Sequence, residues 1–287
     1  MRNHLFFFST DAHASPFDIN IALDAGFDVV IPYSSVKPED AEALTHDIIF
    51  SRGPKGTKHS GIFVGGANVD MAERIAGTAA RSIFEPFTVS IFSDPKGAYT
   101  TAAALVAKVK KAACGLSGKK AVIFGGTGPV GSVAAVLLAR EGARAAIVTS
   151  RDAASGQAAA AEISRKHGVA IHGAAAGDPN ARLELMRGAD IAIATVKAGV
   201  QVVSKELLET LERPVIVADV NAVPPSGFGG LDPHDDGKQI APNVTGIGAL
   251  AIGVVKYKTQ VELYKSMLKK KSRSGFEAAY ELAQSLA

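Results

Sequence analysis

The sequence predicts an α/β protein built from two lobes. Short apolar runs rich in β-branched residues alternate with helical stretches along most of the chain, which is typical of parallel strands flanked by helices. An alanine-rich stretch at residues 97–113 separates two such series and indicates the helix that joins them. The 287 residues exceed one typical domain, and a hydrophobic share of 47% suffices for two cores. We therefore expect a doubly wound lobe and a smaller α/β lobe.

The first hundred residues predict the smaller lobe. In order, we expect strands at 5–8, 27–32, 48–50, 62–64 and 88–93, and helices at 17–25 and 71–83. Gly65 and Gly66 follow one of these strands, but the third glycine of a phosphate-binding turn is missing at the required spacing. This lobe therefore carries no phosphate fingerprint.

The second series predicts the doubly wound lobe. After an apolar run at 121–124 we expect helices at 132–140, 153–166, 181–187 and 204–212, and strands at 145–149, 169–172, 190–195 and 215–220. Residues 221–244 are rich in Gly, Pro and Asp and indicate a loop, and residues 249–271 predict a helix that returns to the first lobe. We place residues 1–102 and 248–287 in one domain and residues 103–247 in the other.

A glycine pattern follows the apolar run of the second lobe. The run leads into Gly126-Thr127-Gly128-Pro129-Val130-Gly131, and the predicted helix begins at once. The three glycines suit a tight turn, close approach of the backbone to a pyrophosphate, and close packing of helix on strand. The helix N-terminus adds unpaired N–H groups. A purely structural turn is the alternative, but the position between strand and helix favours a Rossmann-type dinucleotide site along these six residues.

The end of the next strand indicates which dinucleotide binds. An NAD site usually carries an acidic residue there for the ribose 2′-hydroxyl, whereas this chain has Ser150 and Arg151. A guanidinium pairs bidentately with a 2′-phosphate, so NADP is favoured and NAD tolerated. The alternative is that Arg151 is only a solvated residue. Asp152 comes one position late and is expected to cap the following helix.

Two further strand ends contribute candidate nucleotide contacts. The strand at 190–195 ends at Thr195, and the small residue Ala198 follows closely enough for backbone groups to approach the nicotinamide ribose, although Lys197 stands where a small or apolar residue is expected. The strand at 215–220 presents Asp219 and Asn221 before two prolines and indicates an amide-binding edge. A buried Asp219 that accepts backbone N–H bonds is the alternative.

The first lobe offers polar side chains where strands give way to helices. Asp94, Thr100 and Thr101 follow the strand at 88–93, and Asp18 lies in the turn that begins at Ser15. We expect these groups to face a cleft between the lobes. For the threonines, Ser15 and Asp18, ordinary helix capping is the alternative.

Several classes of function are excluded. The net charge, 31 − 28 = +3, is too small to indicate nucleic acid, and Cys114 is the only cysteine. No apolar run reaches the length of a membrane span or a signal sequence, so we expect a cytoplasmic protein. Histidines show no metal-ligand spacing, and we interpret the acidic loop with Asp232, His234, Asp235 and Asp236 as a solvated turn rather than a metal site. No clear acid–base pair is found, which suits hydride loss from a carbon between two nitrogens, because their lone pairs stabilise the cation.

Six motifs occur in a single order along nearly the whole chain. They are Ser15-Pro16-Phe17-Asp18, the segment 61–66, the segment 94–103, the Gly126 pattern, the segment 219–225 and the segment 246–253. Together they resemble the NAD(P)-dependent methylene-tetrahydromethanopterin dehydrogenases of methylotrophic bacteria. This family oxidises the methylene group of a reduced pterin to methenyl during formaldehyde oxidation, with NADP or NAD as hydride acceptor.

The resemblance implies roles for individual residues and an assembly. The pterin is expected between Asp18, Asp94, Thr100, Thr101 and Asn221, in a substrate and oligomerisation domain completed by the C-terminal helix. Lys256 matches a lysine of the family at this point, and we treat it as the candidate catalytic residue; an exposed lysine beside Lys258 is the alternative. The family forms homo-oligomers, so a trimer or hexamer is expected, without metal, nucleic acid or membrane.

Alternative functions remain open from sequence. Some family members accept methylene-tetrahydrofolate, and no motif reveals the pocket shape that selects between the pterins. A non-catalytic NADP-binding regulatory protein would keep the Gly126 pattern without the polar groups of the first lobe. A shikimate-type dehydrogenase would need a Lys–Asp pair to move a hydroxyl proton, and no clear pair is seen in the first lobe.

Overall fold

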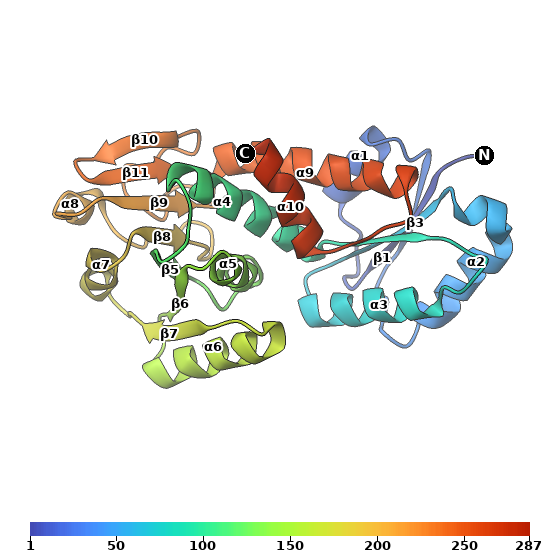
Figure 1. Cartoon of the computed structure of the whole chain (residues 1–287), viewed down its shortest axis with the longest axis horizontal. Helices are drawn as coiled ribbons and strands as arrows, with labels where there is room; N and C mark the ends of the chain where they lie inside the picture. The colour runs from blue at the N-terminus through green and yellow to red at the C-terminus, as the bar shows by residue number, and fades with distance from the viewer. The chain divides into compact units, whose positions relative to one another are not determined.

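The computed structural model describes all residues, 1–287, which divide into two compact units. The first unit contains Met1–Thr100 and Tyr257–Leu282, and the second contains Thr101–Lys256 and Ala283–Ala287. Each unit is an α/β structure with a largely parallel sheet, so the predicted fold class is confirmed (Figure 1). The assignment of the first unit to the substrate and of the second to the nucleotide stays a prediction.

The first unit is built on a five-stranded parallel sheet. Its order is β12-β4-β3-β1-β2, with β1 at His4–Ser9, β2 at Val29–Tyr33, β3 at Ser60–Gly65, β4 at Ser90–Ser93 and β12 at Arg273–Ser274. Helices α2 (Ala41–Thr57) and α3 (Val69–Ser82) cover one face through Ile48, Ile49 and Ile75. On the other face, Tyr264 of α9 (Ala249–Lys269) packs its ring against Phe63 and Phe92. Both faces are thus apolar, as expected for a parallel sheet.

Four more helical elements complete the first unit or run beyond it. Helix α1 (Pro16–Asp24) is capped by Ser15, whose hydroxyl accepts from the N–H of Asp18. The short helix η1 (Pro95–Gly97) leads from β4 into α4 (Ala98–Ala112), and α10 (Phe276–Leu286) ends the chain. Neither β12 nor α10 was predicted. No helix of the chain is both long and apolar enough to cross a lipid bilayer.

One predicted strand of the first unit is wrong. Residues 48–50 lie inside α2 rather than in a strand. The buried positions Ala41, Thr45, Ile48 and Ile49 recur at helical spacing, so the short apolar run is one face of an amphipathic helix. The helical spacing of the buried residues from Ala41 to Ile49 therefore decides the structure, although the β-branched pair Ile48 and Ile49 taken alone favours a strand.

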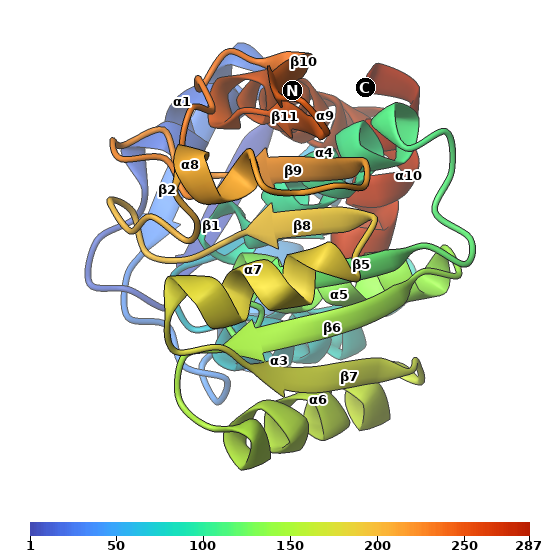
Figure 2. The ribbon, with the colours of Figure 1, turned by 90° about the vertical axis from the view of Figure 1, so that its left-hand side faces the viewer.

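The second unit contains a seven-stranded sheet with order β10-β11-β9-β8-β5-β6-β7 (Figure 2). The strands are β5 (Lys120–Phe124), β6 (Arg144–Thr149), β7 (Ile171–Ala175), β8 (Ile191–Ala194), β9 (Val215–Asp219), β10 (Asp236–Ala241) and β11 (Val244–Ile247). The helices that follow them are α5 (Pro129–Arg140), α6 (Ala153–His167), α7 (Pro179–Arg187) and α8 (Lys205–Leu208). Central strand β5 lies between β6 and β8, so the turn after β5 is flanked by the ends of both neighbours.

Two predictions in the second unit need correction. Residues 221–244 are not a continuous loop, because β10 lies within them and β11 begins at their end. Strand β10 is an antiparallel edge strand that is mostly exposed, so its sequence Asp-Gly-Lys-Gln carries little apolar signal. Helix α8 is also shorter than the predicted 204–212, since it ends at Leu208.

Candidate active site

The turn after β5 shows which glycines serve packing. A Cβ on Gly126 would lie 2.6 Å from Cβ of Ile147, and one on Gly131 would lie 2.6 Å from Oγ1 of Thr195. Gly125 has a φ of +78°, which side chains rarely adopt, and a Cβ there would meet the backbone of Thr195 at 2.7 Å. These three glycines therefore let the turn fit tightly against β6 and the end of β8.

Gly128 differs from its neighbours because the protein leaves room beside it. The nearest atom to a Cβ there would be the carbonyl oxygen of Gly125 at 3.4 Å, which is ordinary contact. Gly128 is also the N-cap of α5, and no side chain caps this helix. Thr127 and Pro129 are exposed and Val130 is half-buried. Open space in front of uncapped helix N–H groups is what a pyrophosphate needs, so a dinucleotide fits this turn.

The end of β6 borders a cavity of about 450 Å³ within the second unit. Ser150 and Arg151 are exposed and line it, together with Thr149, whose hydroxyl accepts from the N–H of Arg151. Asp152 caps α6 by accepting from the N–H of Ser155 at 2.8 Å, as predicted. That backbone bond lowers the pKa of Asp152, and the carboxylate faces the helix. The 2′-end of the predicted nucleotide site is therefore basic.

The ends of β8 and β9 are tied together by hydrogen bonds. Thr195 donates from Oγ1 to the carbonyl oxygen of Phe124 at 3.1 Å, and Asn221 donates from Nδ2 to that of Val196 at 2.7 Å. Asp219 is buried and accepts from the N–H groups of Asn221 at 2.9 Å and Gly227 at 2.6 Å. Burial raises the pKa of Asp219, against the opposing effect of those N–H bonds.

Asp219 therefore has the buried, backbone-bonded arrangement that was the alternative from sequence. Its carboxylate holds the segment after β9 in place. Any effect of Asp219 on a cofactor would act through this loop. Ala198 lies exposed in the turn after β8.

Asp94 organises the polar end of the first sheet. Its carboxyl oxygens accept from the N–H groups of Tyr99 at 2.9 Å and Thr100 at 3.2 Å, and from the Thr100 hydroxyl at 2.6 Å. Asp94 and Thr100 are fully buried, whereas Thr101 is half-buried. Asp94 thus serves as the cap of α4, which the sequence had suggested as a role for the threonines.

Asp18 belongs to a second buried polar group of the same unit. Gln260 of α9 donates from Nε2 to Oδ1 of Asp18 at 2.6 Å. Tyr264 lies one helical turn after Gln260; burial raises the pKa of its hydroxyl well above the usual value, and the charges of Asp18 and Asp94 add to this. The structure therefore brings Asp18 and Asp94 near one tyrosine. Gln260 was missed, because a glutamine inside a long helix carries no motif.

Lys256 is half-buried on α9, one turn before Gln260, so the two side chains lie on the same helix face.

The start of α9 is held by the acidic turn before it. There the carbonyl oxygen of Pro233 accepts from the N–H of Leu250 at 2.8 Å, and a Cβ on Gly248 would lie 2.2 Å from the carbonyl oxygen of Asp232. This junction fixes where the helix that carries Lys256 begins.

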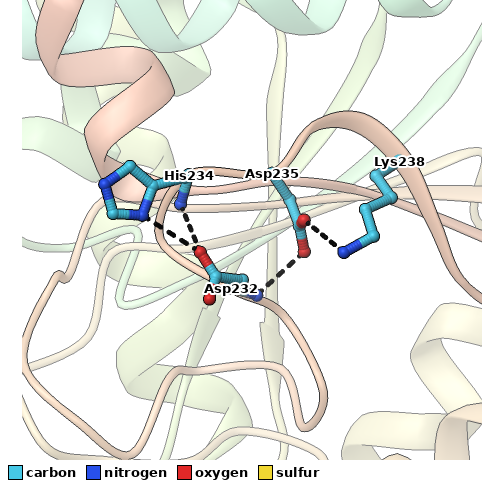
Figure 3. A network of polar contacts seen from close by, with 4 residues as sticks. All are labelled: Asp232, His234, Asp235 and Lys238. Atoms are coloured by element: carbon cyan, nitrogen blue, oxygen red, sulfur yellow. Dashed lines mark hydrogen bonds and ion pairs between the residues drawn. The ribbon is translucent and has the colours of Figure 1, made fainter.

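Hydrogen bonds and an ion pair connect the side chains of the acidic turn to its backbone and to one another (Figure 3). Asp232 accepts from the N–H of His234 at 2.8 Å and from its Nδ1 at 3.2 Å. Asp235 accepts from the N–H of Asp232 at 2.9 Å and pairs with Lys238 at 3.1 Å. No group of His, Cys, Asp or Glu in the chain is arranged to hold a metal ion. The turn is a structural support for α9.

Comparison with known proteins identifies the family. The NAD(P)-dependent methylenetetrahydromethanopterin dehydrogenase of Methylorubrum extorquens is 38% identical over 288 residues, which cover 96% of this chain and 95% of the relative. This chain belongs to the methylene-tetrahydromethanopterin dehydrogenase family. The bifunctional protein MdtA of the same organism is 37% identical and covers 99% of this chain and 98% of its own length. The resemblance inferred from the six motifs is confirmed.

Two domain families match different parts of this dehydrogenase-family chain. The family described as methylene-tetrahydromethanopterin dehydrogenase, N-terminal, matches residues 16–96, and the KR domain matches residues 120–208. Among solved structures, quinate dehydrogenase from Corynebacterium glutamicum in complex with NAD superposes with a TM-score of 0.55 at 12% identity, covering 99% of each chain. At that identity the similarity shows the fold alone.

Proposed function

We propose that this chain oxidises the methylene group of methylene-tetrahydromethanopterin to the methenyl form and passes the hydride to NADP, with NAD as a weaker acceptor, in one-carbon (formaldehyde) oxidation. The observation that supports this most strongly is the 38% identity to an NAD(P)-dependent enzyme of that name, which extends over 96% of the chain and through both units. The polar groups of the first unit favour an enzyme over a protein that only binds the nucleotide.

In this proposal the second unit binds the nucleotide. The pyrophosphate lies beside Gly128, where the first N–H groups of α5 have no side-chain cap. Arg151, exposed at the end of β6, pairs with the 2′-phosphate. The backbone of Thr195 and Ala198 approaches the nicotinamide ribose, whereas the Lys197 side chain between them lines the same cavity as Arg151. The nicotinamide ring supplies the hydride acceptor.

The first unit binds and orients the pterin. Asp94 and Thr100 are bonded to each other and to the start of α4, so they fix the position of Thr101. Asp18 is held by Gln260, and Asn221, which is held by its bond to Val196, is a further proposed substrate residue. These bonds restrict side-chain rotation, which favours catalysis by positioning.

No protein side chain has to accept a proton in the proposed reaction. The methylene carbon lies between two nitrogens, and their lone pairs stabilise the cation that remains when the hydride leaves. Lys256 positions the pterin from the Gln260 face of α9. A charged lysine close to the developing cation would oppose the reaction, so we assign Lys256 no obligatory chemical step.

The direct test is an activity assay with matched substrates. The purified protein is mixed with methylene-tetrahydromethanopterin or methylene-tetrahydrofolate, each with NADP or NAD, and the absorbance of the reduced nicotinamide is followed. The proposal expects the highest kcat/KM for the methanopterin substrate with NADP. Faster oxidation of the folate substrate would make the chain a methylene-tetrahydrofolate dehydrogenase. Nucleotide binding without turnover of either pterin would indicate a regulatory protein.

We further propose that the enzyme acts in the cytoplasm as a homo-oligomer, a trimer or hexamer, on the strength of the family resemblance. Light scattering coupled to gel filtration tests the assembly. A mass of three or six chains of 29.6 kDa is expected. A monomer in the active preparation would contradict this part of the proposal.

A further inference from the structure

The cavity at the end of β6 has walls of one charge sign. Its charged lining residues are Arg151, Arg182 and Lys197, and no acidic side chain lines it. The remaining walls are hydroxyl and apolar groups, among them Thr149, Val148, Val196, Val200 and Val202. An apolar wall with cations at its edge suits a flat base that carries an anionic substituent.

Arg182 differs from the other two cations of the cavity because its side chain is hydrogen-bonded to the protein. The guanidinium of Arg182 donates to backbone carbonyl oxygens on two separate segments, those of Gly177 at 3.2 Å and Val202 at 3.2 Å, with longer bonds to Ala176 and Gln201. Arg182 therefore joins the segment after β7 to the segment after β8. Its charge is directed at the protein, and it acts as a positioning residue for the cavity walls.

Arg151 and Lys197 have side chains that make no hydrogen bond or ion pair within the protein, and both are exposed. They follow β6 and β8, the two strands on either side of β5. The turn that begins at Gly125 thus has one cation without a hydrogen bond or ion pair on each flank, and both cations line the same cavity. Apart from the charge of Asp152 next to Arg151, no acidic side chain is placed near these cations, so an anion that enters the cavity would be attracted by both.

The segment that carries Lys197 is fixed although it has no regular structure. Asn221 holds the carbonyl oxygen of Val196 at 2.7 Å, directly before Lys197. The N–H of Val200 donates to the carbonyl oxygen of Lys197 at 3.2 Å, and Arg182 holds Val202. These hydrogen bonds restrict the backbone on both sides of Lys197, which reduces the entropy lost when its ammonium group binds.

We propose that Lys197 is a second specificity-determining residue for the nucleotide and binds the adenosine 2′-phosphate together with Arg151. This inference rests on the proposed NADP site and extends it. Arg151 gives the phosphate its orientation through a planar guanidinium, and Lys197 adds a point charge from the opposite side of the glycine turn. The pyrophosphate is served by α5, so it does not need Lys197.

The test uses nucleotide fragments and needs no pterin. Binding of 2′,5′-ADP and of 5′-AMP, which differ by the 2′-phosphate, is measured by calorimetry for the full chain and its variants. Lys197→Met keeps the apolar stem, and Lys120→Met, an exposed lysine at the other end of β5, is the matched control. We expect Lys197→Met to weaken 2′,5′-ADP about tenfold, the equivalent of one charge-assisted hydrogen bond, and 5′-AMP less than about twofold.

Three results would overturn the inference. One is an equal loss for both fragments, which would place Lys197 at the adenosine body. Another is no loss for either fragment. The third is a wild-type protein that binds 2′,5′-ADP no tighter than 5′-AMP. Arg151→Ala measured in parallel shows whether the two cations share one phosphate, because the double variant should then lose selectivity altogether. A protein that binds the fragments as expected but oxidises no pterin would refute the proposed function and leave this inference standing.

Discussion

Gln260 donates a hydrogen bond of 2.6 Å to the carboxyl group of Asp18, although 242 positions separate the two residues in the sequence. Both side chains are buried. The bond ties α9 to the first turn of α1, so a helix near the end of the chain stabilises a predicted substrate residue near its start.

Removing this donor should destabilise the protein. In Gln260→Leu the Asp18 carboxyl loses a buried donor at nearly constant side-chain volume, and we expect the free energy of unfolding to fall by about 1–3 kcal/mol. Urea denaturation measures the change. Gln284→Leu is the control, because Gln284 is exposed and bonds only to the surface residue Lys110. An equal effect of both variants would show that the Asp18 bond adds nothing to stability.

Asp219 allows a prediction about pH. In Asp219→Asn one of the two N–H donors, from Asn221 or Gly227, faces an amide NH₂ group, so we expect the variant to lose about 1–3 kcal/mol of unfolding free energy. Burial raises the pKa of the wild-type carboxyl, so its contribution is complete below the unfolded pKa and decreases as pH rises through the folded one. The difference between wild type and variant should therefore shrink with rising pH. Denaturation at several pH values checks this, and a difference that grows with pH would contradict it.

Two glycines of the turn after β5 are expected to have different roles, Gly126 in packing and Gly128 in nucleotide binding. Gly128→Ala should fold with a Tm within a few degrees of wild type, because the new Cβ meets only ordinary contact, but it should bind NADPH at least about tenfold more weakly. Gly126→Ala places a Cβ 2.6 Å from that of Ile147 and should lower the Tm clearly. Thermal unfolding and NADPH fluorescence give both values. A Gly128→Ala protein with unchanged affinity would remove the pyrophosphate from this turn.

Lys258, which is exposed and lies two residues after Lys256, is a matched control for a kinetic test of Lys256. Lys256→Met should lower kcat or raise KM for the pterin, whereas Lys258→Met should leave both within about twofold. Single-turnover reduction of the nucleotide should persist in Lys256→Met, because no step requires its amine. Complete loss of that reduction, with pterin binding intact, would give Lys256 an essential chemical role.

Local patterns predicted most of the strands and the glycine turn, because each depends on residues that are neighbours in sequence. Asp152 was recognised as a cap for the same reason. The interactions that hold the candidate site are long-range and carry no local signal. Neither Gln260 nor Arg182 belongs to a sequence motif. Their roles become visible only in the folded structure, where Gln260 donates to Asp18 and Arg182 donates to the carbonyl oxygen of Val202.

The errors have equally physical causes. The strand at 48–50 was predicted from three apolar residues alone. The buried residues Ala41 and Thr45 precede them at helical spacing, and the structure shows the helix α2 there. Edge strand β10 was missed because its exposed residues need no apolar pattern. From the sequence alone, Asp219 could either contact the cofactor or be buried and accept backbone N–H bonds, because both roles require a carboxylate at a strand end. The structure shows the second arrangement.

In the proposed reaction a hydride moves directly from the pterin methylene carbon to the nicotinamide. The most direct measurement uses methylene-tetrahydromethanopterin with deuterium at both methylene positions and mass spectrometry of the reduced nucleotide formed in ordinary water. Direct transfer predicts one deuterium in each molecule of NADPH formed. A reduced nucleotide without deuterium would mean that the hydrogen exchanges with solvent on the way, and it would contradict this account.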